Sequence, residues 1–367
     1  MSAPPPADPT PPPDGLPGPV VVVGAGLIGA SIGLALRRAG VAVHLEDHDR
    51  GSLRLAESLG AGSAAPPPGD PVLVLVAVPP DHIAGVVVEA LRRWRGAAVS
   101  DVGSVKVRPL AEVSAAAPDE VRRYVGSHPM AGSERSGPLA ASSALFDGRA
   151  WATCAAPGAD SAAVELVERL VATCRAVLVR MSPAEHDAAV ARISHLPHVL
   201  SALAAARLVD APSVHLTLAG QGLRDVTRVA AGDPGLWQQI LGANAGSVAA
   251  LLREVRDDID RLVLELRTAE PRLLPLLRRG VEGTRTIPGK HGGPVRTEAP
   301  VFVVVPDRPG ELARLFADAG DAGINIEDVR IDHDPGRPAG LVEISVTDGA
   351  AEDLVVALGD RGWVAHR

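Results

Sequence analysis

The sequence predicts an α/β protein whose first and largest part is a doubly wound parallel sheet. Three observations predict it: strands and helices alternate up to about residue 180, helical periodicity alone follows, and the alternation returns near residue 300. With 367 residues, the chain is long enough for two to three domains. We expect a disordered Pro-rich tail at 1–17, a sheet domain at 18–181, a helical domain at 182–287, a linker at 288–298 and a small βαββαβ domain at 299–367.

Short β-branched or apolar runs mark the strands. The first strand is expected at residues 20–23, followed by a glycine turn and by a helix over residues 30–38. Further strands of the same sheet are expected at residues 41–46, 72–78, 97–100, 150–155 and 176–180. In the last domain, strands at 301–305, 324–331, 341–347 and near 363 alternate with helices at 311–319 and 351–358, which is the ferredoxin-like order.

Composition excludes several classes of partner and site. The net charge is −8 and no Lys/Arg block occurs, so nucleic acid and charged membrane surfaces are poor partners. No apolar run approaches the ~20 residues that span a bilayer. The two cysteines, Cys154 and Cys174, have no paired spacing, so neither a disulfide framework nor a cysteine-ligated metal is expected. We therefore expect a cytoplasmic protein that acts on a small molecule.

A glycine motif predicts the cofactor site. The run from Gly24 through Gly26, Leu27 and Ile28 to Gly29 follows the first strand and opens the first helix, as a dinucleotide-binding fingerprint does in a Rossmann domain. The glycines permit a tight turn, approach of the pyrophosphate to the backbone and close packing of the helix, whose N-terminus faces the phosphates. A purely structural glycine turn is the alternative.

The end of the second predicted strand sets the cofactor preference. Asp47 is placed to accept the ribose hydroxyls and to repel a phosphate there, which favours NAD. Glu46 is an alternative acceptor, and His48 and Arg50 leave tolerance of NADP open.

Two further residues are candidates for chemistry on the substrate. Ser104 follows the fourth predicted strand, at the sheet edge where ligands bind, although a serine in such a turn is often only a helix cap. His128 ends a short segment in a loop rich in small residues, and histidine is suited to proton transfer near neutral pH. A single histidine is more often structural, so its role depends on the surrounding motifs.

Five motifs in order resemble the prephenate dehydrogenase family over residues 20–280. They are GAGLIGAS, DVGSVK, HPMAGSE, SHLPH and RDVTR, the last at residues 224–228. The resemblance implies NAD-dependent oxidative decarboxylation of prephenate to 4-hydroxyphenylpyruvate in tyrosine biosynthesis, by a homodimer whose helical domain forms the dimer. It implies that His128 accepts a hydrogen bond from the ring hydroxyl with help from Ser104, that Arg228 binds a carboxylate, and that His198 lies in the substrate pocket.

The residue types agree with that chemistry, because prephenate carries two carboxylates and a hydroxyl. Arg228 can bind a carboxylate bidentately, and Asp225 would hold its guanidinium if the stretch is helical. An exposed ion pair is the alternative. Glu134 is a candidate partner for the amine of arogenate, so arogenate dehydrogenase remains the nearest alternative. Trp237 of the family's D-P-x-x-W motif is expected to line the site or to pack in the core.

Other interpretations are disfavoured. His195 and His198, with His186, suggest a metal site, but no carboxylate at helical spacing completes a ligand set, so no metal is expected. A β-hydroxyacid dehydrogenase would be expected to use a lysine of the helical domain, and no lysine occurs between residues 183 and 279. A non-enzymatic sensor would be expected to lose His128, Ser104 or Arg228, and all three are present.

The last 68 or so residues resemble an ACT module, through Asp307 to Leu312 and Gly323 to Ile326. Such modules bind amino acids, which implies an effector site that uses Asp307, Gly310, Asn325 and Ile326. Tyrosine is the expected effector, and an inert dimerisation domain is the alternative.

Overall fold

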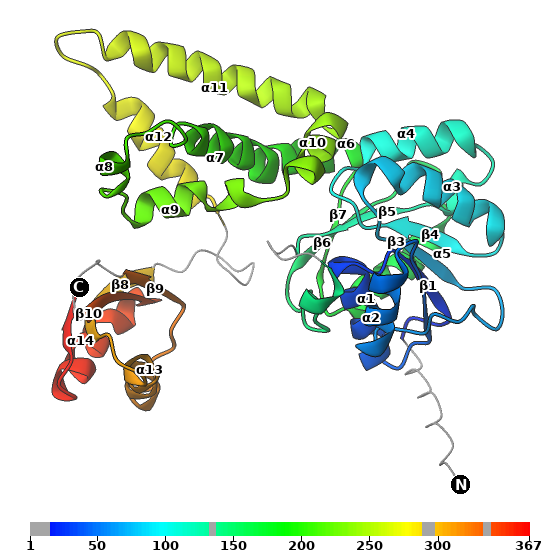
Figure 1. Ribbon diagram of the computed structural model, residues 1–367, viewed down its shortest axis with the longest axis horizontal. Helices are drawn as coiled ribbons and strands as arrows, with labels where there is room; N and C mark the ends of the chain where they lie inside the picture. The colour runs from blue at the N-terminus through cyan, green and yellow to red at the C-terminus, as the bar shows by residue number, and fades with distance from the viewer. Residues whose placement is uncertain (1–14, 132–136, 288–297, 333–338) are drawn as a thin grey trace. The chain divides into compact units, whose positions relative to one another are not determined.

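The computed structural model describes residues 15–131, 137–287, 298–332 and 339–367. The chain forms two compact units that divide between Leu264 and Glu265. Figure 1 traces the chain from blue at the N-terminus to red at the C-terminus. Most of the predicted tail and linker, as well as Glu134, lies outside the described residues. None of the described helices is long and apolar enough to cross a membrane.

The N-terminal part of the first unit is a parallel sheet with helices on both faces. Its strands are β1 (Val20–Val23), β2 (Val43–Glu46), β3 (Leu73–Val76) and β4 (Ala98–Asp101), in the order β2-β1-β3-β4. The connections are α1 (Leu27–Arg38), α2 (Arg50–Ser58), the 3-10 turn η1 (Pro80–His82) with α3 (Ile83–Arg93), and α4 (Val107–Ala116) after β4. This is the predicted doubly wound arrangement, with the carboxyl ends of the strands at one edge.

The later strands form a separate small sheet, which corrects the expectation of one continuous sheet to residue 180. Strands β5 (Gly126–Pro129), β6 (Ala150–Cys154) and β7 (Val177–Arg180) pair in that order, and one parallel bridge, Val99 to Tyr124, links them to β4. β5 and β6 are antiparallel, a pairing that needs no crossover helix. β6 and β7 are parallel and are joined by α5 (Ser161–Thr173). His128 lies within β5, so the expectation that it stands in a loop is wrong.

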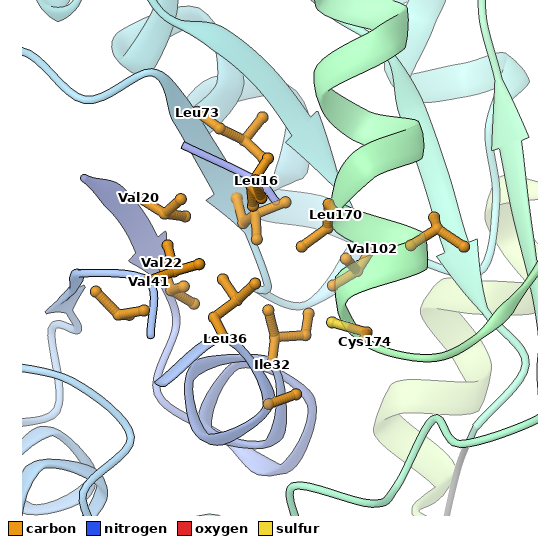
Figure 2. Packing of buried hydrophobic residues seen from close by; sticks show 14 of the residues in the cluster. Leu16, Val20, Val22, Ile32, Leu36, Val41, Leu73, Val102, Leu170 and Cys174 are labelled. Carbon is orange, nitrogen blue, oxygen red and sulfur yellow. The ribbon is translucent and has the colours of Figure 1, made fainter. Parts of the chain in front are cut away.

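The core of this part packs α1 and α5 against the sheet. Figure 2 shows Val22, Ile32, Leu36 and Leu170 meeting in one cluster, and all four are fully buried. Leu16 belongs to the same cluster, so the predicted tail ends too far along the chain. The proline-rich composition predicts a solvated tail, and a single leucine does not change that prediction. Burying this leucine side chain nevertheless contributes about 1.5–3 kcal/mol to folding.

The rest of the first unit is helical, as predicted. After α6 (Pro183–Val190) a π-helical turn, η4 (Ala191–His195), leads directly into α7 (Leu196–Ala206). There follow α8 (Ser213–Leu216), α9 (Gln221–Thr227), the 3-10 turn η5 (Arg228–Ala231), α10 (Pro234–Ala243) and α11 (Ala245–Glu265). Ser182 and Glu185 form a capping box that starts α6.

The second unit contains α12 (Leu274–Arg285) and a domain of the predicted βαββαβ order. Its elements are β8 (Glu298–Pro306), α13 (Glu311–Asp321), β9 (Asp328–Asp332), β10 (Ala339–Thr347), α14 (Ala351–Asp360) and β11 (Val364–His366). The sheet is antiparallel in the order β11-β8-β10-β9. Inward-facing valines and isoleucines of β8 and β10 alternate along the strands and pack on Leu315 and Leu354 of the two helices.

Candidate active site

The glycine motif forms a close-packed turn at the carboxyl end of β1. Gly24 has φ +103°, and a Cβ there would lie 2.2 Å from the Ala77 carbonyl oxygen. A Cβ on Gly29 would lie 1.8 Å from the Gly24 oxygen, so the third glycine lets α1 approach the turn. Gly26 has open space around its Cα and lines a pocket. The turn therefore presents bare backbone at a helix N-terminus, which suits a pyrophosphate.

The pocket at this turn has a volume of about 580 Å³ and reaches across the ends of β1, β2 and β3. Asp47 lines it, and its carboxylate accepts hydrogen bonds from the backbone N–H of Ala25 at 2.6 Å and of Asp49 at 2.7 Å. Glu46 instead pairs with Arg93 at 3.0 Å. Of the two predicted acceptors, Asp47 is therefore the one that faces the pocket.

Two more acidic residues, Asp81 and Glu89, also line the pocket. His48 lines the pocket with a side chain that is 98% exposed. The bare backbone of the turn, the carboxylate of Asp47 and the size of the pocket together fit a dinucleotide without a 2′-phosphate.

His128 begins a chain of three polar side chains. Its Nδ1 lies 2.9 Å from Nε2 of His186, and Nδ1 of His186 lies 2.8 Å from Oδ1 of Asp187. Burial, followed by the nearby His186 and Lys106, lowers the pKa of His128 well below its ordinary value. His128 is therefore unprotonated at neutral pH and can accept a proton. Sequence reasoning considered His186 only as a metal ligand and missed this contact, because 58 residues separate the two histidines.

Ser104 lies partly buried in the connection between β4 and α4. It does not cap α4: Asp187 does, accepting from the backbone N–H of Lys106 at 2.8 Å and of Val107 at 2.9 Å. The alternative to a functional role for Ser104 was that it caps α4, and in the structure Asp187 accepts these hydrogen bonds instead.

A buried ion pair fixes the same connection. The Lys106 ammonium contacts the Asp101 carboxylate and donates to the Ser127 carbonyl oxygen at 2.7 Å. The Tyr124 hydroxyl donates to Asp101 at 2.7 Å, and burial beside this carboxylate raises the pKa of Tyr124 well above its ordinary value. Since Ser127 precedes His128, this network holds the backbone of the catalytic candidate.

The helical part contributes a second cluster. The ring of His198 stacks on Trp237 with centroids 3.5 Å apart, and His195 meets the same indole edge-on at 6.1 Å. Burial lowers the pKa of both histidines, that of His195 to about 4. Asn244 connects the clusters, because its Nδ2 lies 2.7 Å from the Asp187 carbonyl oxygen and 3.3 Å from Nδ1 of His195. Trp237 is half-buried against the two rings rather than enclosed in a core.

Nδ1 of His198 is buried and has no hydrogen-bond partner in the described part of the chain. Arg228 starts η5, which packs against α7, and its side chain is exposed. Asp225 lies one turn earlier in α9, as the predicted helix requires, and accepts from Nε2 of Gln221 at 2.8 Å. In the described ranges, no group of three or more His, Cys, Asp or Glu side chains is arranged to hold a metal ion.

The predicted effector residues lie in the second unit. Gly310 adopts φ +93° at the start of α13, shortly after Asp307, a conformation that favours glycine. Nδ2 of Asn325 donates to Glu327 at 2.9 Å, and Ile326 packs against the core of this domain.

Comparison with known proteins identifies the family of the two domains between residues 32 and 278. The nucleotide-binding domain of prephenate dehydrogenase matches residues 32–180, and the dimerization domain of prephenate dehydrogenase matches residues 182–278. A probable prephenate dehydrogenase, NovF of Streptomyces niveus, is 41% identical over 358 residues, which cover 94% of this chain and 99% of the relative. Prephenate dehydrogenase of Bacillus subtilis is 27% identical over 89% of this chain and 91% of its own.

Solved structures agree in fold. Prephenate dehydrogenase from A. aeolicus, in complex with hydroxyphenyl propionate and NAD+, superimposes with a TM-score of 0.65 at 27% identity. The match covers 72% of this chain and 96% of that one. Synechocystis arogenate dehydrogenase has the same fold, with a TM-score of 0.61 at 24% identity over 72% of this chain and 96% of that one. With both family domains matched and a relative 41% identical over 94% of this chain, the chain belongs to the prephenate dehydrogenase family.

Proposed function

We propose that this chain catalyses the NAD-dependent oxidative decarboxylation of prephenate to 4-hydroxyphenylpyruvate. The observation that carries the proposal is His128, which is partly buried, has a lowered pKa and lies near the carboxyl end of β5. The bridge between Val99 and Tyr124 makes β5 run parallel to β4, so His128 lies towards the sheet edge that carries the glycine turn.

Bound NAD supplies a hydride acceptor for the hydroxyl-bearing ring carbon of the substrate. As hydride leaves that carbon, its oxygen becomes more acidic and the hydroxyl proton moves towards Nε2 of His128. The ring carboxylate departs as carbon dioxide, and the electron pair of the broken C–C bond makes the ring aromatic. The proton then returns to the phenol oxygen, so no net proton is released.

The remaining site residues bind and orient the substrate in this proposal. Ser104 donates to the ring hydroxyl, and the guanidinium of Arg228 binds a carboxylate bidentately. His198, whose buried Nδ1 lacks a protein partner among the described residues, forms part of the substrate pocket with Trp237. Asp225 keeps its expected role at the guanidinium, whereas Glu134 would meet an amine only with arogenate, the alternative substrate.

The proposal is tested by initial rates of NADH or NADPH formation. Prephenate and arogenate are each assayed with NAD and with NADP. The proposal predicts the highest kcat/KM for prephenate with NAD. A preference for arogenate would retain the mechanism and leave Glu134 as a candidate partner of the substrate amine, whereas no turnover with any pair would contradict an enzymatic function.

The helical part indicates a homodimer. Large apolar side chains stand exposed along α7 to α11, among them Leu203 at 56%, Leu218 at 85% and Val226 at 57%. A monomer rarely exposes so many, and the matched domain is a dimerization domain. We propose that a second copy covers them.

The βαββαβ domain is proposed to be an ACT domain that binds tyrosine. The positive-φ turn at Gly310 and the exposed amide of Asn325 place polar groups beside α13 and β9, where an α-amino acid can be held between two domains. Both cysteines are free and buried, which supports a reducing compartment such as the cytoplasm.

A further inference from the structure

We propose that His186 and Asp187 are positioning residues that fix the tautomer of His128, so that its Nε2 presents a lone pair to the substrate hydroxyl. The inference rests on the proposed function of His128 as the acceptor of that hydroxyl's hydrogen bond.

The direction of hydrogen-bond donation along His128, His186 and Asp187 is set at the Asp187 end. An ionised carboxylate can only accept hydrogen bonds, and Asp187 also accepts from the backbone N–H of Lys106 and of Val107. The nitrogen of His186 that faces it, Nδ1, must therefore carry a hydrogen. In a neutral ring this leaves Nε2 of His186 as an acceptor, 2.9 Å from Nδ1 of His128. His128 then donates through Nδ1 and keeps its lone pair on Nε2.

A proton added to His186 would reverse this polarity. Both nitrogens of His186 would then donate, so Nδ1 of His128 would become the acceptor and its hydrogen would move to Nε2. That tautomer has no lone pair for the substrate. In the proposed state the His186 ring is neutral, and with His186 and Asp187 only 1% and 3% exposed its two nitrogens are held by His128 and Asp187 rather than by bulk water.

The pair is also held rigidly. Asp187 is anchored to the start of α4, and Asn244 donates to its carbonyl oxygen. The rings of His128 and His186 meet edge to face, with centroids 5.1 Å apart and an interplanar angle of 68°. A side chain at the start of the helical part therefore orients the base on β5.

The test compares His186→Leu with His186→Gln. Leucine cannot accept the hydrogen from Nδ1 of His128. A glutamine carboxamide keeps one donor and one acceptor in the same relative arrangement, with its NH₂ directed to Asp187 and its oxygen to His128. We expect kcat of the leucine variant to fall about 10²-fold or more with KM for NAD unchanged, because this is the usual size of a general-base contribution. The glutamine variant should recover most of that loss.

The tautomer itself is read by ¹⁵N NMR of the full-length protein labelled on histidine, with His128→Asn used to assign the signal. We expect a protonated Nδ1 and a bare Nε2 for His128 in the wild type and in His186→Gln, and a protonated Nε2 in His186→Leu. A wild-type His128 that carries its hydrogen on Nε2, or a leucine variant with wild-type kcat, would overturn the inference.

The spectrum does not depend on turnover. It decides the tautomer in the wild type even if the leucine variant fails to fold or if no substrate reacts. A failure of the proposed function, seen as no activity with any substrate, is thus distinguished from a failure of this inference.

Discussion

At the residue scale, the proposed chemistry depends on His128, whose lowered pKa keeps the ring able to accept a proton. His128 and Ser104 are candidates from the sequence alone because each lies in a short motif, and their roles stay predictions. His186 could not, because its importance comes from a contact with a residue 58 positions away. The choice between Asp47 and Glu46 likewise needed the structure, because only the structure shows that Asp47 lines the pocket while Glu46 pairs with Arg93.

The pKa of His128 makes a prediction about pH. A base whose pKa lies well below 6.5 stays unprotonated through neutrality. We expect kcat/KM for the substrate to be flat from about pH 8 to below pH 6.5 and to fall only on further acidification. Half-loss of kcat/KM at pH 6.5 would instead indicate a histidine with an ordinary pKa.

Asp47 makes a prediction about the cofactor. In Asp47→Asn the amide oxygen can still accept from Ala25, but the negative charge is lost. We expect KM for NAD to rise about tenfold and the preference for NAD over NADP to shrink, since a charge-assisted hydrogen bond and a repulsion both disappear. The matched control is Asp49→Asn, which keeps its cap on α2 and should leave both constants near wild type.

At the element scale, the connection between β4 and α4 is held by the buried Lys106–Asp101 pair and by the side chain of Asp187. The order of strands and helices could be predicted from periodicity and glycine turns. The second sheet could not, because pairing partners and strand direction depend on tertiary contacts that short apolar runs do not encode.

The Lys106–Asp101 pair predicts a large cost for its disruption. Lys106→Met leaves a fully buried carboxylate without its cation, so we expect the free energy of unfolding of the N-terminal part to fall by about 3–5 kcal/mol. Denaturant unfolding monitored by tryptophan fluorescence measures it. Arg108→Met, which removes the exposed pair with Glu112, is the control and should cost less than about 1 kcal/mol. Equal effects of the two substitutions would refute the structural role of Lys106.

At the scale of the whole molecule, the chain combines an enzyme with a small C-terminal domain. The matches to the two solved relatives include 96% of each relative but only 72% of this chain. These relatives therefore have no counterpart to the rest of this chain. The sequence predicted the βαββαβ order of that domain, whereas a ligand for it stays a proposal.

Regulation is predicted to require the βαββαβ domain, which begins at β8. Tyrosine should inhibit the full-length chain, whereas a chain ending at residue 287 should retain turnover and lose that inhibition. Initial rates over a tyrosine titration measure both. Equal inhibition of the two chains would show that tyrosine acts at the catalytic site, and the regulatory role of the C-terminal domain would be wrong.

The central claim, that His128 is the catalytic acceptor in an NAD-dependent dehydrogenase, is tested most directly by His128→Asn. Turnover of prephenate and binding of NAD by calorimetry are measured on the same preparation. The account predicts that kcat falls by roughly 10²–10⁴ while the Kd for NAD stays at its wild-type value, since the glycine turn is untouched. Normal turnover in the variant would contradict it.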